Sequence, residues 1–214
     1  TSNLYVGGGV QVALSFINEL NNINAKNNYH IFISKTIKDQ IDQHIFSNKF
    51  KFYFIPKSPS HLVERLKTVK FLSSLERKII PDVVFTVFGP SYWKPKAPHI
   101  MGFANGWLYN PMSIAYTKLT LFNRVRMRVF CWYQEYYLKR DANFFIVETL
   151  DAKSKLSMVS SIDVNKIAVV GNTCSSIFDD RKYIDRDFEH YISLPKKENN
   201  EFRLLYIAHN HPGK

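Results

Sequence analysis

The sequence predicts an α/β fold in which an open, mostly parallel sheet carries helices on both faces. Short apolar runs rich in β-branched and aromatic residues alternate along the chain with longer segments of helical periodicity. One run, Val83–Val87, is continuously apolar, as in a strand that is buried on both faces. Because parallel neighbours need crossover connections, the intervening helical segments fit a parallel sheet best.

The first third of the chain opens with a glycine turn, Gly7–Gly9, that leads directly into a helix. Only Leu4–Val6 precede the turn, fewer residues than an average strand has, so the first strand is expected to lie upstream of Thr1 or to be unusually short. The elements expected after the turn are a helix from Val10 to Leu20, strands at 30–34 and 50–55 with a short helix at 36–44 between them, and a helix from Ser60 to Leu75.

The remaining part of the first domain repeats the alternation of strands and helices. The stretch 114–140 carries apolar residues three or four apart, which predicts one long amphipathic helix. The positions that define its apolar face are Leu119, Phe122, Val125, Val129, Trp132 and Tyr136. The other elements expected here are strands at 83–87, 98–103, 144–147 and 167–170 and a helix at 149–158.

Composition changes near the end of the chain and indicates three segments. Residues 1–178 form the predicted first domain, and residues 179–201 are a charged connection without apolar periodicity. The apolar run Phe202–Ala208 then reads as a buried strand followed by only six residues. A lone strand cannot complete a domain, so residues 202–214 are expected to be the first strand and loop of a truncated second domain.

Composition is that of a globular protein with an excess of positive charge. Hydrophobic residues make up 45%, and 29 Lys and Arg against 18 Asp and Glu give a formal charge of +11, which favours anionic partners. Cys131 and Cys174 show no C-x-x-C spacing, so a reducing, cytoplasmic setting is expected. The sequence shows no secretion signal and no run of about 18 apolar residues, so membrane contact is expected only from the surface.

Two kinds of segment are candidates for ligand contact. Gly7–Gly9 precedes a helix, where free backbone N–H groups and the helix dipole attract a phosphate, although a tight turn needing positive φ is an equal explanation. The loops Gly89–Trp93 and Gly102–Asn110 follow strands, and ligands of open parallel sheets bind at the carboxyl ends of strands. Their rings and amides suit sugars, but the aromatic residues could equally cap the core or face a partner domain. Asn105 is favoured for the cleft.

Basic residues concentrate on the predicted long helix, where Arg124, Arg126 and Arg128 lie among aromatic residues. A solvated helix face is the preferred explanation, and contact with an anionic membrane surface is the next. His209 and His211 lack the companions of a metal site, so a phosphate-facing loop is favoured and no metal site is expected. The sequence carries no pattern typical of hydrolytic enzymes.

Read in order, several segments resemble the group 1 glycosyltransferases, also called glycosyltransferase family 4, of the GT-B fold. The resemblance covers nearly the whole chain and depends more on order and spacing than on any single motif. Gly7–Ala13 resembles the glycine loop and first helix of the family. Gln134–Thr149 resembles the family passage in which an acidic residue is followed by basic residues, by a strand and then by Ser or Thr. Lys166–Asn172 with Phe178 resembles the end of the first domain, and Phe202–Ala208 resembles the first strand of the second domain.

The resemblance implies a retaining transfer of a sugar from a nucleotide-sugar donor to a glycan or lipid-linked acceptor, in cell-surface polysaccharide synthesis. It implies no cofactor and no obligatory metal. The first domain, Rossmann-like and acceptor-side, would place Gly7, Gly8 and Gly9 toward the donor phosphates, whereas the truncated second domain would hold the nucleotide with a pair of glutamates beyond Lys214. The residues expected by this resemblance are Asn105, Trp107 and Tyr109 in the acceptor cleft and Asn172, His209 and Lys214 between the domains.

The sequence departs from the family pattern in one place. Many members carry a histidine after the fifth strand, where this chain reads Gly102–Gly106, and His99 lies ahead of the strand core. No catalytic residue is therefore assigned, and the 214 residues alone are expected to lack transferase activity. A non-catalytic module that binds a sugar or a nucleotide is the alternative function, and a basic nucleic-acid-binding domain is a weaker one; no nucleic-acid partner is expected.

Overall fold

The computed structural model describes Leu4, residues 7–23, 26–60 and 63–173, and Asn200. The chain divides into two units, Thr1–Asn172 and Thr173–Lys214. Almost every described residue belongs to the first unit. Apart from Asn200, the predicted connection 179–201 and the predicted start of a second domain at 202–214 lie outside the described residues.

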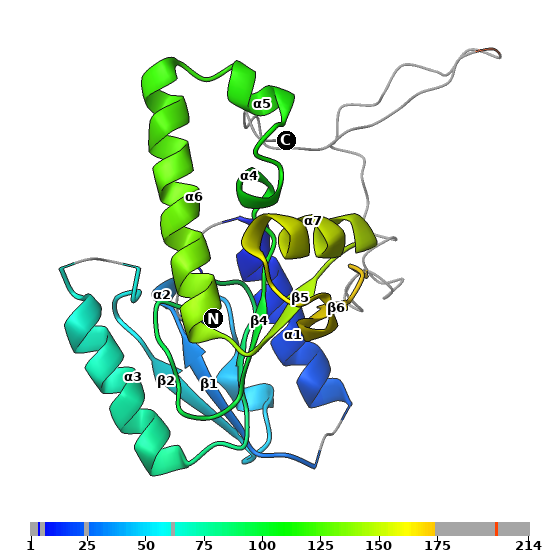
Figure 1. The fold of residues 1–214 in the computed structure, drawn as a ribbon. Coiled ribbons are helices and arrows are strands. Elements are labelled where there is room, and N and C mark those ends of the chain that lie inside the picture. The colour runs from blue at the N-terminus through cyan, green and yellow to red at the C-terminus, as the bar shows by residue number, and fades with distance from the viewer. Residues whose placement is uncertain (1–3, 5–6, 24–25, 61–62, 174–199, 201–214) are drawn as a thin grey trace, which may run out of the picture. The chain divides into compact units, whose positions relative to one another are not determined.

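The first unit alternates helices and strands along its whole described length (Figure 1). The helices are α1 (Gly8–Asn22), α2 (Lys35–Lys38), α3 (Arg65–Ile79), α4 (Gly106–Tyr109), α5 (Ile114–Thr117), α6 (Leu121–Asp141) and α7 (Leu150–Ser160), with two 3₁₀ turns, η1 (Gln43–Ile45) and η2 (Val164–Lys166). The strands are β1 (Tyr29–Ile33), β2 (Phe50–Phe54), β3 (Val84–Thr86), β4 (His99–Gly102), β5 (Phe144–Val147) and β6 (Ile167–Val169).

Every described strand pairing is parallel, which confirms the predicted fold class. β1 and β2 form a two-stranded sheet in which Tyr29 lies opposite Phe50. β3, β4, β5 and β6 form a four-stranded sheet in that order, with Val84 opposite His99 at its start. Each pair of neighbours along the chain is joined by a helix or a long loop, as parallel pairing requires.

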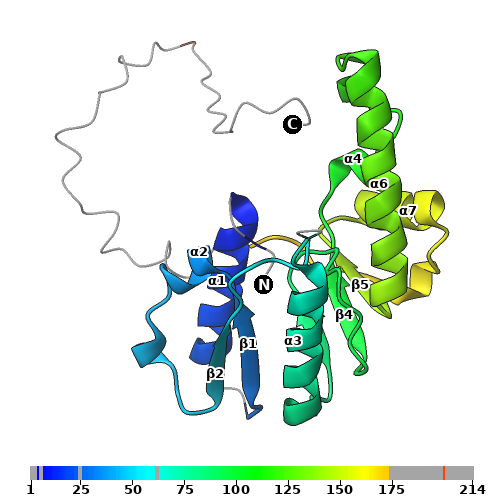
Figure 2. The ribbon, with the colours of Figure 1, turned by 90° about the vertical axis from the view of Figure 1, so that its left-hand side faces the viewer.

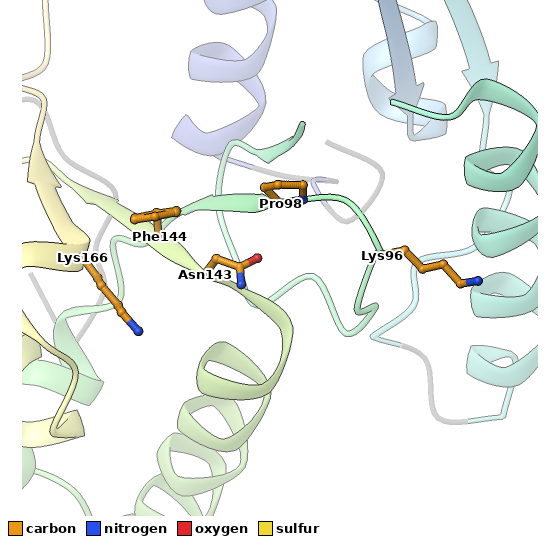
Figure 3. A pocket seen from close by; sticks show the side chains of 5 residues that line it. All are labelled: Lys96, Pro98, Asn143, Phe144 and Lys166. Carbon is orange, nitrogen blue, oxygen red and sulfur yellow. The ribbon is translucent and has the colours of Figure 1, made fainter. Parts of the chain in front are cut away.

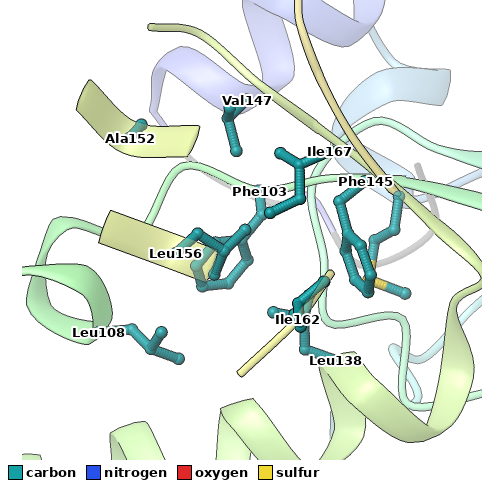
Figure 4. Close-up of a cluster of buried hydrophobic side chains, with 10 residues drawn as sticks. Phe103, Leu108, Leu138, Phe145, Val147, Ala152, Leu156, Ile162 and Ile167 are labelled. Atoms are coloured by element: carbon teal, nitrogen blue, oxygen red, sulfur yellow. The ribbon is translucent and has the colours of Figure 1, made fainter. Parts of the chain in front are cut away.

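Helices cover both faces of the strands. Figures 1 and 2, taken from directions 90° apart, show α3 and α6 on one side of the strands and α1 and α7 on the other. The main hydrophobic core lies between the four-stranded sheet and the helices α4, α6 and α7 (Figure 4). Its buried residues are Met101, Phe103, Leu108, Leu138, Phe145, Val147, Ala152, Leu156, Ile162 and Ile167. A second buried cluster joins α1 to β1 and to Val87 after β3.

The predicted long helix at 114–140 is two helices instead, α5 and α6. The chain breaks at Thr120, whose Oγ1 accepts a hydrogen bond from the N–H of Asn123 at 3.3 Å and so caps α6. The predicted apolar face is also wrong, because Phe122, Val125, Val129, Trp132 and Tyr136 are all exposed. The side of α6 that meets the domain carries Cys131, Gln134, Leu138 and Asp141, at spacings of three and four.

Two other predicted helices have different bounds in the structure. The helix expected at 36–44 is a single turn, α2, followed by η1, because the Asp42 side chain accepts the N–H of His44 at 3.0 Å and starts a new turn. α3 begins at Arg65 rather than near Ser60, and its buried stripe is Thr68, Leu72 and Glu76. The buried Glu76 carboxylate accepts the backbone N–H groups of Lys96 and Ala97, so it fixes the segment that leads into β4.

Candidate functional site

The glycine turn lies beside the carboxyl end of β3. Gly7 is the N-cap of α1 and has φ of 75° and ψ of −164°, a conformation that residues with a side chain rarely adopt. No side chain caps this helix end, and its first turn holds no acidic residue. Among the described residues, therefore, no anionic side chain meets the positive end of the α1 dipole, and the N–H of Val10 donates to the Gly7 carbonyl at 3.1 Å.

The three glycines differ in what surrounds them. A Cβ atom on Gly7 or Gly8 would meet no atom within 4 Å, so the turn is open on that side. A Cβ atom on Gly9 would lie 3.2 Å from Leu4 Cδ2 and 3.4 Å from Phe88 Cδ2. Gly9 thus lets the helix pack closely against the residues after β3, whereas Gly7 and Gly8 leave room for a ligand.

Asn105 lies in the loop after β4 and joins two elements. Its Oδ1 accepts the N–H of Trp107 at 3.0 Å and caps α4, and its amide nitrogen donates to Oε1 of Gln134 on α6. The side chain is half-buried. Because both of its polar atoms are engaged within the protein, Asn105 fixes the loop at the carboxyl end of β4.

The structure brings Trp107 close to Asn105 and directs Tyr109 elsewhere. The Trp107 ring meets the ring of Tyr116 edge-on, with centroids 5.0 Å apart, and the Trp107 carbonyl accepts the Tyr116 hydroxyl at 2.9 Å. Tyr109 packs edge-on against Phe103 in the core, and burial, followed by the charges of Glu148 and Asp151, raises the pKa of its hydroxyl. Trp107 therefore faces α5, and Tyr109 faces the core and the start of α7.

The loop after β3 caps the core rather than opening to solvent. Ser91, Tyr92 and Trp93 are all buried. The Trp93 indole N–H donates to Ser73 Oγ on α3 at 3.1 Å, and its ring packs with Ile55 and Leu72. The sequence leaves open whether these rings bind a sugar or cap the core, and the described contacts fit packing against the core.

A tyrosine cluster around Arg65 is the main feature of this region that sequence reasoning missed. The guanidinium carbon lies 4.9 Å from the ring centre of Tyr137, 5.0 Å from that of Tyr92 and 5.6 Å from that of Tyr133. All three guanidinium nitrogens donate inside the protein, to Tyr137 Oη and to the carbonyls of Pro59 and Ser60. Arg65 thus joins α3, the loop after β3 and α6, and each of its three guanidinium nitrogens donates one hydrogen bond there.

His99 has a structural position at the amino end of β4. Its ring is fully buried; Nδ1 lies 2.6 Å from the Asp141 carbonyl oxygen and Nε2 lies 2.8 Å from Thr86 Oγ1. Since a carbonyl can only accept, Nδ1 carries the proton, and the neutral ring accepts the Thr86 hydroxyl at Nε2. This position is at the opposite edge of the sheet from the glycine turn.

Stability is expected to fall on acidification through the titration of His99. Burial lowers the pKa of His99 below its ordinary 6.5, so the unfolded chain takes up a proton first and the stabilisation present above pH 6.5 is lost as the pH falls toward the folded pKa. Burial raises the pKa of Asp141 above its ordinary 3.8, so this carboxyl has the opposite effect between pH 3.8 and its raised folded pKa, where the native state binds the extra proton.

Urea unfolding at pH 7.5 and 5.5 measures this loss. We expect H99Q to be less stable by about 1–3 kcal/mol at pH 7.5, through the lost buried hydrogen bonds, and to show a smaller drop between the two pH values. The partly buried His30, whose pKa is also lowered, serves as the control, because H30Q should leave most of the pH dependence in place. An unchanged drop in H99Q would contradict the assignment.

Of the remaining predicted site residues, only Asn172 lies in the described part of the chain, and it follows the carboxyl end of the parallel strand β6. Asn172 is exposed and lies just after β6. His209 and Lys214 lie outside the described residues. Within the described part of the chain, no three His, Cys, Asp or Glu side chains are grouped in a way that could hold a metal ion, and no described helix is long and apolar enough to cross a membrane.

A small cavity of about 330 Å³ lies at the amino edge of the sheet, lined by Lys96, Pro98, Asn143, Phe144 and Lys166 (Figure 3). The two lysine side chains point apart, and Oδ1 of Asn143 already accepts the N–H of His99 at 2.9 Å. The polar groups do not converge on one point, so this cavity is a weaker candidate site than the carboxyl edge.

The parallel sheet with helices on both faces defines the class of the protein as an open α/β domain of Rossmann-like type. No protein-family model matches the chain, and no curated protein matches it at a significant level.

Proposed function

We propose that the chain is part of a retaining glycosyltransferase that transfers a sugar from a nucleotide-sugar donor to a glycan or lipid-linked acceptor, in cell-surface polysaccharide synthesis. The observation that carries the proposal is the uncapped amino end of α1 beside the carboxyl end of β3, where Gly7 and Gly8 leave open space. An anion at this point would meet the first turn of α1 and its favourable dipole, and donor phosphates are such anions.

The resemblance to family 4 supports the proposal through residues that now have defined positions. In the passage Gln134–Thr149, Gln134 holds Asn105, Asp141 is buried, and Thr149 caps α7 by accepting the N–H of Ala152 at 3.1 Å. Lys166–Asn172 contains β6. These contacts stabilise the fold of the segments that carry the resemblance, and sugar transfer by the protein is our proposal.

The acceptor would approach over the loop that Asn105 and Trp107 form at the end of β4. This loop is held by one hydrogen bond to Gln134 of α6 and by the hydroxyl and ring of Tyr116 of α5, so its shape is fixed before any ligand binds. A sugar acceptor needs ring faces and hydrogen-bonding groups at a fixed distance from the donor. Tyr109, which packs into the core, would support the loop rather than contact the acceptor.

A lipid-linked acceptor also fits the surface of residues 112–132, which we call the arm. The arm contains α5 and the first half of α6, and it extends past the carboxyl edge (Figures 1 and 2). It carries four basic residues and no acidic one, and apolar side chains such as Met112, 91% exposed, and Phe122, 77% exposed, lie among them. Exposed apolar and basic side chains together are typical of surfaces that bind anionic membranes.

Reversal of charge on the arm is expected to weaken membrane binding. The double variant R126E/R128E should bind vesicles of phosphatidylglycerol and phosphatidylcholine more than about tenfold less well, since each basic residue near such a surface contributes about 1 kcal/mol. Co-sedimentation at constant salt measures the binding. The control K70E/K78E makes the same charge change on exposed positions of α3 and should bind as the wild type does. Equal losses in both variants would show only an effect of net charge.

Calorimetry with UDP-glucose and GDP-mannose tests whether the 214 residues bind the donor by themselves or need the rest of the longer protein. The 214-residue chain should show weak or no binding, and the product of the longest reading frame that contains the chain should bind one class of sugar nucleotide. Micromolar binding by the 214 residues alone would contradict the proposed division and favour the alternative function, a non-catalytic module that binds nucleotides or sugars.

A further inference from the structure

The short helix α5 and the residues just before it combine exposed apolar side chains with a buried tyrosine. Met112, two residues before α5, is 91% exposed, and Ile114, the first residue of α5, is 77% exposed. Tyr116, two residues further along, is only 5% exposed. This single turn of helix therefore presents two large apolar side chains to solvent, while its tyrosine contacts the rest of the domain.

Tyr116 connects α5 to the loop after β4. Its hydroxyl donates to the Trp107 carbonyl oxygen at 2.9 Å, and its ring meets the Trp107 ring edge-on, with centroids 5.0 Å apart. Burial raises the pKa of this hydroxyl, so it stays protonated and able to donate at neutral pH. The loop proposed for the acceptor is thus held by α5 through Tyr116 and by α6 through Gln134.

A second set of contacts joins α5 to α6. The Tyr116 carbonyl oxygen accepts from Arg124 Nε at 3.2 Å, and the Thr117 carbonyl oxygen accepts from Arg124 Nη2 at 3.4 Å. The Tyr116 hydroxyl also lies 3.5 Å from Cys131 Sγ. Because α5, the first half of α6 and the loop after β4 all contact Tyr116, a restraint on α5 also acts on the loop.

We propose that α5 couples membrane contact of the arm to the acceptor loop, residues 102–110, and that Tyr116 is the positioning residue between them. Met112 and Ile114 enter the headgroup region of an anionic membrane, which then holds α5 in place. The acceptor loop opens by separating Trp107 from Tyr116, so a restrained α5 reduces this opening, and a loop that opens less binds an acceptor more tightly. The inference rests on the membrane contact in the proposed function and adds control of the acceptor site by the membrane.

Hydrogen exchange with and without vesicles tests the proposal. Saturating vesicles of phosphatidylglycerol and phosphatidylcholine should slow the exchange of residues 105–109 in the wild-type chain by at least about fivefold and leave residues 167–169, in β6, unchanged. Y116F keeps the ring and the exposed apolar residues but loses the hydroxyl. It should therefore bind the vesicles as the wild type does and show less than about a twofold slowing at 105–109. A thermal melt checks that the variant is folded.

Serine substitutions separate the coupling from membrane binding itself. M112S/I114S should bind the vesicles at least about tenfold less well, because two apolar side chains no longer enter the headgroup region. V63S/I80S removes two apolar side chains of similar exposure, 90% and 80%, outside the arm, and should behave as the wild type does. A wild-type chain that does not bind the vesicles would overturn the membrane contact and this inference together. Binding without slower exchange at 105–109, or full slowing in Y116F, would overturn this inference alone.

Discussion

Replacement of Gly102 by alanine is expected to destabilise the domain by at least about 3 kcal/mol. A Cβ atom at this position would lie 1.9 Å from the Val87 carbonyl oxygen and 3.0 Å from its carbon. The obstacle is backbone, and the Gly102 carbonyl itself accepts the N–H of Gly89 at 2.8 Å, so the two segments cannot separate without losing that bond. Overpacking that displaces backbone falls at the upper end of single-substitution effects.

The matched control is G106A, four residues along the same loop. Gly106 is the first residue of α4, and a Cβ atom there would meet nothing within 4 Å. Alanine should therefore be neutral or stabilise by up to about 1 kcal/mol, because it restricts the unfolded chain and favours a helix. Urea unfolding of both variants measures the difference. A Gly102 variant within about 0.5 kcal/mol of the wild type would mean that β3 and β4 are not as close as described.

In the product of the longest reading frame that contains this chain, replacement of Gly8 by aspartate is expected to reduce sugar transfer by more than about 100-fold while the protein stays folded. Open space surrounds Gly8, so the side chain fits. A carboxylate in the first turn of α1 should stabilise the helix by about 0.3–1 kcal/mol through the dipole. The same carboxylate would occupy the place proposed for the donor phosphates and repel them.

The control for this substitution is G8A, which adds a methyl group without charge. We expect G8A to keep the transfer rate within about threefold and G8D to lose it, with thermal melts that show both variants folded. Opposite directions of stability and activity in G8D are the distinguishing result, since a merely structural glycine would lose both together. Full activity in G8D would place the donor phosphates elsewhere.

The strands could be predicted from the sequence because their signal is local. Val83–Val87 and Phe144–Val147 are short apolar runs between turn residues, and each coincides with a strand. The partial exposure of β3 could not be predicted, because the cover of Phe85, 37% exposed, depends on contacts with other elements, such as Phe16 of α1.

The orientation of α6 could not be predicted from hydrophobic periodicity. The side that meets the domain contains Gln134 and Asp141, polar residues whose hydrogen bonds are made inside the protein, so a count of apolar residues selects the opposite side. The position of Arg65 could not be predicted from local patterns either, because its hydrogen bond to Tyr137 joins residues 72 positions apart. The spacing of Tyr133 and Tyr137 on one helix side was the only sequence signal for that cluster.

Nucleotide release from UDP- and GDP-sugars by the product of the longest reading frame that contains this chain tests the proposed transfer. We expect release that depends on a lipid extract as acceptor, a product that keeps the anomeric configuration of the donor by NMR, and a loss of rate in G8D. A folded protein that releases no nucleotide from any donor, and instead binds DNA or RNA with steep salt dependence, would contradict it.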